Sequence, residues 1–203
     1  DRIDSVGRHL QANDTGVMEG AKQDYRAKHI VSILEGIKTK MSSSSSSTTL
    51  AYSPGLASVT DDDTNTSAYN EAVRIATEAD VAIIVVGIDG TVEGEQLDRH
   101  NVVLPGAQEQ MIRDIATARL AAGKGVARKV EENIETNNDS AAATSAAAAT
   151  SAMIVVLING GPISCDWLQG ETPVPIAVVE AFEGGQSAGT ALAETIYGEN
   201  NPS

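Results

Sequence analysis

The chain has 203 residues, which is room for one domain, and its 41% hydrophobic and 21% charged residues are typical of a globular protein. The chain has 28 Asp and Glu residues and 14 Lys and Arg residues, which gives a net charge of −14. This net charge argues against nucleic-acid binding and charge-driven membrane docking, both of which need clustered basic residues. The apolar run Val81–Ile88 is far shorter than the roughly 20 residues that cross a bilayer.

The part of the chain before Val81 predicts a helix, a short strand and a second helix. Apolar side chains at helical spacing mark residues 30–38, and a low-complexity serine and threonine segment follows at 42–49. Leu50–Tyr52 reads as a short strand. A helix is expected over Ser67–Ala79, with a buried face made of Ala68, Ala72, Ile75, Ala76 and Ala79.

The pattern then alternates between buried strands and helices. Val81–Ile88 is apolar throughout, as strands covered on both faces are. A helix after Pro105 should bury Met111, Ile112, Ile115 and Ala116. Further strands are predicted at 153–158 and 175–179, and a last helix at 187–197. Residues 121–152 are polar and then rich in Ala, Ser and Thr, which indicates an insertion without chemistry. The predicted fold is an open α/β sandwich with a mainly parallel sheet flanked by helices.

In such a fold, ligands meet the loops at the carboxyl ends of the strands. These loops are 89–101, 159–166 and 181–185. The first is the richest in chemistry, with carboxyl groups at Asp89, Glu93, Glu95 and Asp98. A carboxyl group beside an apolar strand end can act as a general acid. The alternative is that these are solvated charges, with Asp98 paired to Arg99 or another base.

Other candidate groups favour structural roles. Gly160-Gly161 and Gly184-Gly185 match no phosphate-binding fingerprint, so tight turns are preferred. A lone cysteine, Cys165, excludes an internal disulfide and a cysteine-rich zinc site. The three histidines lack metal-ligand spacing, and we expect no metal or cofactor. Trp167 is either a sugar-stacking platform or, as we favour, a packing residue.

Several blocks together resemble the C-terminal α/β-sandwich domain of glycoside hydrolase family 3, in its β-xylosidase and β-glucosidase branches. They are Val85–Arg99, Leu104–Ile112, Val155–Ile163, Val179–Ala191 and Ile196–Pro202. The resemblance covers about residues 28–203 outside the low-complexity segments. It implies one such domain over 1–203, truncated at both ends.

The resemblance also implies a retaining mechanism with two carboxyl groups. The nucleophile is an Asp on a separate N-terminal (β/α)₈ barrel, and this chain has no barrel. The acid/base Glu lies in a loop ending Glu-Gly-Tyr/Leu-Asp-Arg, which places it on Glu95. Asp98 and Arg99 match the Asp-Arg pair and are expected to hold the loop. Gln96 stands where the family usually has Gly, and Glu93 is the alternative acid.

Three functions remain open at this point. The first is part of an exo-acting retaining β-glycosidase that acts on an oligosaccharide or β-glycoside, inactive alone for lack of the nucleophile. The second is a non-catalytic carbohydrate-binding or scaffold domain. The third, a nucleotide-binding module, is disfavoured because no phosphate loop is present. The resemblance suggests a secreted, vacuolar or lysosomal protein, while the sequence itself leaves the compartment and the sugar unknown.

Overall fold

A computed structural model describes residues 30–43, 47–124, 152–168, 172 and 174–202. Its centre is a three-stranded parallel sheet in the order β1-β2-β3, formed by β1 (Val81–Gly87), β2 (Ala152–Ile158) and β3 (Ile176–Glu180). Val81 pairs with Ala152 and Met153 with Ile176. The structure therefore confirms the open α/β architecture with a parallel sheet.

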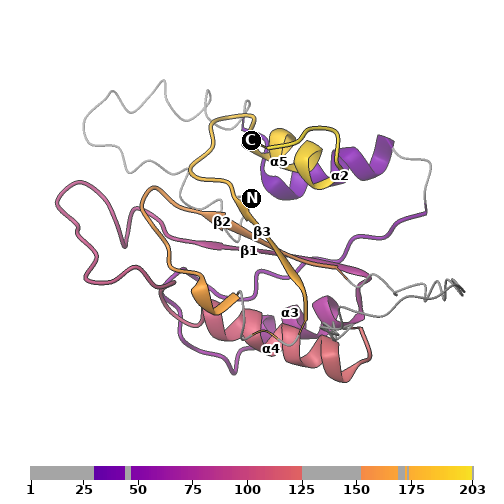
Figure 1. The fold of residues 1–203 in the computed structure, drawn as a ribbon, viewed down its shortest axis with the longest axis horizontal. Helices are drawn as coiled ribbons and strands as arrows, with labels where there is room; N and C mark the ends of the chain where they lie inside the picture. Colours follow the sequence, from indigo (N-terminus) through magenta and orange to yellow (C-terminus); the bar gives the residue numbers. More distant parts are fainter. Residues whose placement is uncertain (1–29, 44–46, 125–151, 169–171, 173, 203) are drawn as a thin grey trace, which may run out of the picture.

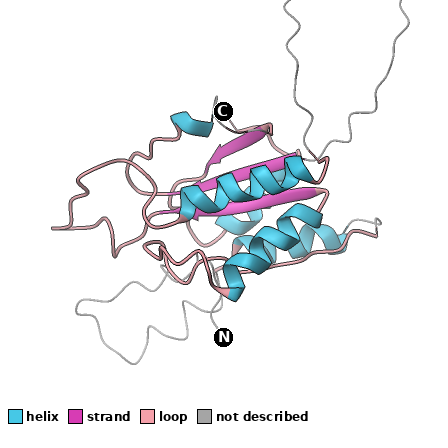
Figure 2. Ribbon diagram, turned by 90° about the horizontal axis from the view of Figure 1, so that it is seen from below, coloured by secondary structure: helices cyan, strands magenta, loops and turns pink. Residues whose placement is uncertain are grey.

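Helices lie on both faces of this sheet, as Figures 1 and 2 show. On one face α3 (Ser67–Glu78) packs against α4 (Gln108–Ala121), and both contact β1. On the other face α2 (Ile33–Ser43) packs against α5 (Ala188–Ile196). A short 3₁₀ turn, η2 (Asp166–Leu168), follows β2.

The hydrophobic core lies between the sheet and the α3–α4 layer. All four residues expected on the apolar face of α4 are buried there, as are alternate residues of β1. Alternation follows from the pleat, which sends successive side chains to opposite faces. The members of the core from these two elements are Ala82, Ile84, Val86, Met111, Ile112, Ile115 and Ala116.

The expected buried face of α3 is only partly correct. Ala72 is buried, but Ala68, Ile75, Ala76 and Ala79 remain partly exposed. Tyr69 is buried instead. The sheet ends at β1 among the described residues, so no further strand covers this side of α3.

Three further predictions need correction. Leu50–Tyr52 is not a strand, because no described strand lies beside it to complete a ladder. The low-complexity segment predicted at 42–49 overlaps a helix, since Ser42 and Ser43 are the last two residues of α2. The proposed insertion is shorter than 121–152, because Ala121 ends α4 and Ala152 begins β2; residues 125–151 lie outside the described residues.

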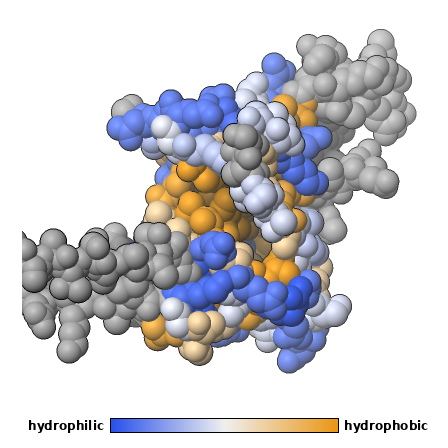
Figure 3. All heavy atoms as spheres, turned by 90° about the vertical axis from the view of Figure 1, so that its right-hand side faces the viewer, coloured by the Kyte–Doolittle hydropathy of each residue, from blue (hydrophilic) through white to orange (hydrophobic). Residues whose placement is uncertain are grey.

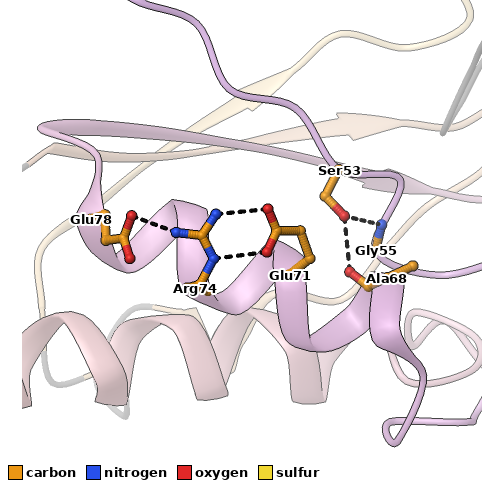
Figure 4. A network of polar contacts seen from close by, with 6 residues as sticks. All are labelled: Ser53, Gly55, Ala68, Glu71, Arg74 and Glu78. Atoms are coloured by element: carbon orange, nitrogen blue, oxygen red, sulfur yellow. Dashed lines mark hydrogen bonds and ion pairs between the residues drawn. The ribbon is translucent and has the colours of Figure 1, made fainter.

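Polar contacts fix α3 to its surroundings (Figure 4). Arg74 forms ion pairs with Glu71 at 2.7 Å and with Glu78 at 2.6 Å on the exposed face of the helix. Ser53 Oγ donates a hydrogen bond of 2.9 Å to the Ala68 carbonyl, which attaches the extended segment before Pro54 to the start of α3. The exposed ion pairs contribute little to stability, typically 1 kcal/mol or less.

Candidate functional site

The loops after β1, β2 and β3 meet at one edge of the sheet, because parallel strands end on the same side. These are the three loops that the sequence singled out. The longest, between β1 and α4, ends at Gly106, whose φ is +61°. A Cβ there would lie 2.5 Å from the Asp61 carbonyl, so this turn requires glycine.

A two-residue hairpin forms the tip of the β1 loop. Gly94 and Leu97 exchange backbone hydrogen bonds of 3.0 and 3.2 Å, which leaves Glu95 and Gln96 at the turn. Gln96 has a φ of +70°, in the left-handed region that favours glycine. Glu95 is exposed, and no described residue is its hydrogen-bond or ion-pair partner. The hairpin thus presents the Glu95 carboxyl group to solvent.

An ion pair below the hairpin joins the β1 loop to the β2 loop. Arg99 Nε donates to Glu93 Oε2 at 2.5 Å, and Arg99 Nη2 donates to the Pro162 carbonyl at the same distance. The Arg99 side chain is only 8% exposed. A backbone hydrogen bond of 2.7 Å from Ser164 N to the Val102 carbonyl joins the same two loops. Together these contacts clamp the loop that carries Glu95.

The ion pair observed in this loop differs from the expected pairing of Arg99 with Asp98. Arg99 holds the loop as expected, but its carboxylate partner is Glu93 and not Asp98. Asp98 is exposed and makes no ion pair with a described residue. Glu93, the alternative acid, is engaged by Arg99 and lies against Gly161, where a Cβ would come within 2.2 Å of its Oε1. The structure therefore assigns Glu93 a contact that holds the loop.

Asp89 begins the loop and is buried. Its Oδ1 accepts hydrogen bonds from Thr91 N at 2.8 Å and from Thr91 Oγ1 at 2.5 Å. Its backbone carbonyl accepts from Val92 N and Glu93 N. Such Asx-type contacts fix the direction in which a chain leaves a strand. Asp89 thus shapes the loop base and is not presented to a ligand.

Two residues of the other loops were not predicted as part of this region. Asn159 is buried at the end of β2 and donates from Nδ2 to the Gly161 carbonyl at 2.8 Å, which tightens the turn. The Glu183 carboxyl group lies beside Gly160, about 3.5 Å from where a Cβ would stand. The Asn159 contact is local to its own turn. The Glu183 contact has no local sequence signal, because it depends on how the β2 and β3 loops meet.

The remaining candidates have structural environments. Cys165 and Trp167 are partly buried and pack against the core, and the Arg113 guanidinium lies 4.8 Å from the Trp167 ring centroid. His100 is exposed, while the other two histidines lie outside the described residues. Within the described ranges, no three His, Cys, Asp or Glu side chains are grouped so that they could hold a metal ion. No helix described here is long and apolar enough to cross a membrane.

The chain belongs to the family of the glycosyl hydrolase family 3 C-terminal domain, whose model matches residues 1–127 and 120–203. Among its relatives, thermostable beta-glucosidase B of Acetivibrio thermocellus is 29% identical over 154 residues, which cover 76% of this chain and 16% of that protein. Exo-1,4-beta-xylosidase xlnD of Aspergillus awamori is 31% identical over 139 residues, 68% of this chain and 14% of that protein.

Solved structures agree with the fold. The exo-beta-xylosidase XlnD, solved with a xylobiose aziridine probe, superposes with a TM-score of 0.59 at 25% identity, over 85% of this chain and 17% of that one. The family 3 beta-glucosidase of Bifidobacterium adolescentis superposes with a TM-score of 0.57 at 22% identity, over 85% and 19% of the two chains. This chain spans less than a fifth of the length of each relative named here.

Proposed function

We propose that this chain supplies the acid/base carboxyl group of an exo-acting retaining β-glycosidase of the β-xylosidase or β-glucosidase type. Glu95 is the residue. It protonates the departing glycosidic oxygen in the first step and deprotonates the incoming water in the second. The observation that carries the proposal is the exposed position of Glu95 at the tip of a hairpin whose base is clamped by Arg99.

The arrangement suits a carboxyl group that acts on a substrate bound elsewhere. A retaining enzyme needs its two carboxyl groups about 5–5.5 Å apart across the scissile bond. Glu93 and Asp89 are both engaged within the loop, which leaves Glu95 and Asp98 exposed. Of these two, Glu95 lies at the hairpin turn, and the family motif matches the acid/base to it. The second carboxyl group is the Asp that family members carry on their barrel, and on this proposal the chain works only beside such a barrel.

Two assays test the proposal. The purified chain alone should not hydrolyse an aryl β-glycoside above the level of a Glu95→Ala control, because the nucleophile is missing. With a family barrel supplied in trans, turnover should appear and should depend on Glu95. Turnover by the chain alone that depends on Glu95 would show that the second carboxyl group lies in this chain.

The choice of substrate separates acid/base catalysis from a structural role. A poor leaving group needs protonation and a good one departs without it. In the barrel-containing enzyme, Glu95→Ala should therefore cost about 10²–10⁴-fold on an unactivated disaccharide and much less in the glycosylation step of a dinitrophenyl glycoside. Azide, which needs no base, should rescue the second step and give a β-glycosyl azide.

Matched variants complete the design. Asp98→Ala removes an exposed carboxyl group of the same loop and should leave both substrates nearly unaffected. If Glu95→Ala loses the same factor on both substrates and azide has no effect, Glu95 is not the acid/base. Retained sugar binding without turnover would then favour the carbohydrate-binding or scaffold alternative.

A further inference from the structure

The tripeptide Asn65-Thr66-Ser67 spans the start of α3 and takes no part in the loops at the carboxyl ends of the strands. It has the form Asn-x-Ser with a middle residue other than proline, which is the acceptor sequence for N-linked glycosylation. Two other matches, at Asn13 and Asn138, lie outside the described residues. Asn201 does not match, because Pro202 follows it. Asn65 is therefore the match whose surroundings the structure describes.

Asn65 lies in a turn and is exposed to solvent. Its backbone N–H donates a hydrogen bond of 2.9 Å to Asp63 Oδ1, which fixes the turn through the main chain. Among the residues that the structure describes, none forms a hydrogen bond with the Asn65 side chain. A substituent on the side-chain amide of Asn65 therefore displaces no contact in this part of the chain.

The middle residue of the tripeptide, Thr66, caps the helix. Its Oγ1 accepts a hydrogen bond of 3.0 Å from Tyr69 N, and its backbone is extended, with φ −70° and ψ 154°. In extended backbone successive side chains point to opposite sides, so Asn65 and Ser67 should share the side opposite Thr66. The burial agrees, since Asn65 and Ser67 are exposed and Thr66 is half-buried. The two residues that define the acceptor sequence thus face solvent, while the third is held by the helix.

The turn that carries Asn65 is held in place by Asp61. The two carboxylate oxygens of Asp61 accept hydrogen bonds from Ala57 N at 2.9 Å and from Asp63 N at 3.1 Å. The Asp61 carbonyl accepts from Ala107 N at 2.8 Å, which ties the turn to the start of α4. None of these bonds uses the Asn65 amide, so its modification leaves the turn intact.

The surface around the tripeptide is polar. Arg74 forms ion pairs with Glu71 and Glu78 along the exposed face of α3 (Figure 4). Apolar side chains gather in the middle of the surface seen in Figure 3, between two more polar layers. The α3–α4 layer, which lies below the sheet in Figure 1, is one of these polar layers. A hydrated oligosaccharide at the start of α3 therefore stands over polar surface.

We propose that Asn65 is an acceptor for N-linked glycosylation in the secretory pathway. The co-substrate is a lipid pyrophosphate-linked oligosaccharide that begins with N-acetylglucosamine. The amide nitrogen of Asn65 forms a bond to the anomeric carbon of this sugar and gives up one proton. The bond from that carbon to the pyrophosphate oxygen breaks, and the lipid pyrophosphate leaves with the electron pair. The Ser67 hydroxyl is the group by which the transferase recognises the acceptor.

The test directs the full chain through the secretory pathway of eukaryotic host cells. Peptide mass spectrometry of the secreted chain should find an oligosaccharide on Asn65. Peptide N-glycosidase should release it from the native chain without denaturant, because Asn65 is exposed, and should leave aspartate at this position. The same chain made in the cytosol of the host should carry no oligosaccharide on Asn65.

Two variants at Ser67 provide a matched pair. Ser67→Ala removes the hydroxyl that the transferase reads and should abolish the modification of Asn65, whereas Ser67→Thr keeps a hydroxyl and should retain it. Neither variant removes the Thr66 cap of α3. Both are made together with Asn13→Gln and Asn138→Gln, so that the mobility of the chain on a gel reports position 65 alone.

Amide hydrogen exchange tests whether the folded chain accepts the oligosaccharide. The Tyr69 amide donates to the Thr66 cap, so its exchange rate reports the start of α3. This rate should differ less than twofold between the glycosylated chain and the chain from which the oligosaccharide has been released. A large difference would show that the modification opens the helix start.

Three results would overturn the proposal. The first is a secreted chain whose Asn65 peptide carries no oligosaccharide. The second is equal modification of Ser67→Ala and Ser67→Thr, which would indicate attachment that does not read the acceptor sequence. The third is loss of Tyr69 protection in the glycosylated chain. The peptide measurement uses the chain without substitutions and does not depend on how the variants fold. None of these results bears on Glu95, since the proposal does not rest on the acid/base assignment.

Discussion

The hydroxyl group of Tyr69 donates a hydrogen bond of 2.7 Å to Asp114 Oδ2, and this bond joins α3 to α4 above the buried core. Tyr69 is buried, and burial is the main cause that raises its pKa above the ordinary value, with the hydrogen bond to Asp114 adding to the shift. The bond is therefore made by a phenol that stays protonated in the folded chain through neutral and mildly alkaline pH.

Tyr69→Phe should lower the free energy of unfolding by about 1 kcal/mol at pH 7, the usual net value of such a hydrogen bond. Since the folded-state pKa is raised, the stabilisation is complete below the unfolded pKa near 10 and is lost as pH rises toward the folded value. Urea unfolding at a series of pH values should show the difference between the two proteins shrinking above about pH 10. Tyr197→Phe, at an exposed tyrosine, should show no loss at pH 7.

Arg119 should be the most sensitive charged residue of the described core. It is fully buried and donates hydrogen bonds to the carbonyls of Ala79 and Asp80 at 3.0 Å and of Ala152 at 3.3 Å. Arg119→Leu removes these hydrogen bonds, and we expect a loss of about 3 kcal/mol or more in the free energy of unfolding. Calorimetry should show the thermal midpoint falling by roughly 6–12 °C.

The control for that change is Arg74→Leu, which breaks the exposed ion pairs with Glu71 and Glu78. It should cost about 1 kcal/mol or less. Equal effects of the two substitutions would show that the buried contacts of Arg119 contribute no more than surface charge.

Gln96→Gly should stabilise the chain by about 1 kcal/mol, because Gln96 occupies the left-handed region at φ +70° and a non-glycine residue there is strained. The gain should appear as a higher denaturant midpoint with an unchanged slope. Glu95→Gly, at the neighbouring position without a positive φ, should stabilise nothing. A lower midpoint for Gln96→Gly would mean that the Gln96 side chain contributes more than its backbone strain costs.

Arg99→Leu should free the β1 loop from the β2 loop, since it removes the contacts with Glu93 and Pro162. The amide of Ser164, which bonds to Val102 across the two loops, should exchange at least tenfold faster, as expected when a local opening becomes easier. Asp98→Ala should leave that rate unchanged. If both variants exchange alike, the clamp does not hold these loops together.

The sequence was informative where burial is periodic. The apolar runs of β1 and β2 and the helical stripe of α4 correspond to the buried elements of the structure, because hydrophobic periodicity reflects the surface that an element must cover. The prediction of a strand at Leu50–Tyr52 was wrong because it rested on local composition alone. A strand needs a neighbour, and local composition does not show whether one is present.

The candidate site could likewise be predicted where a local motif marks it, but not where it depends on contacts between loops. The loop that carries Glu95, and the role of Arg99 in holding it, could be expected from a local motif. The partner of Arg99 could not, since Glu93, Glu95 and Asp98 all lie within six residues of it and the nearest in sequence, Asp98, is not the partner. Likewise Arg119 and Tyr69 are fixed by contacts to residues far away in sequence. Pairings of this kind depend on how loops and helices meet in space.

The contact between α2 and α5 bears on how the chain acquires its structure during synthesis. At the crossing, a Cβ on Gly36 would lie 2.0 Å from the Gly189 carbonyl, so the two backbones touch. These helices are the first and the last described along the chain. While the ribosome is still adding residues before α5, α2 has no helix to pack against, and its apolar side chains are open to chaperones and to other nascent chains. We therefore expect this layer to be completed only after α5 has left the ribosome.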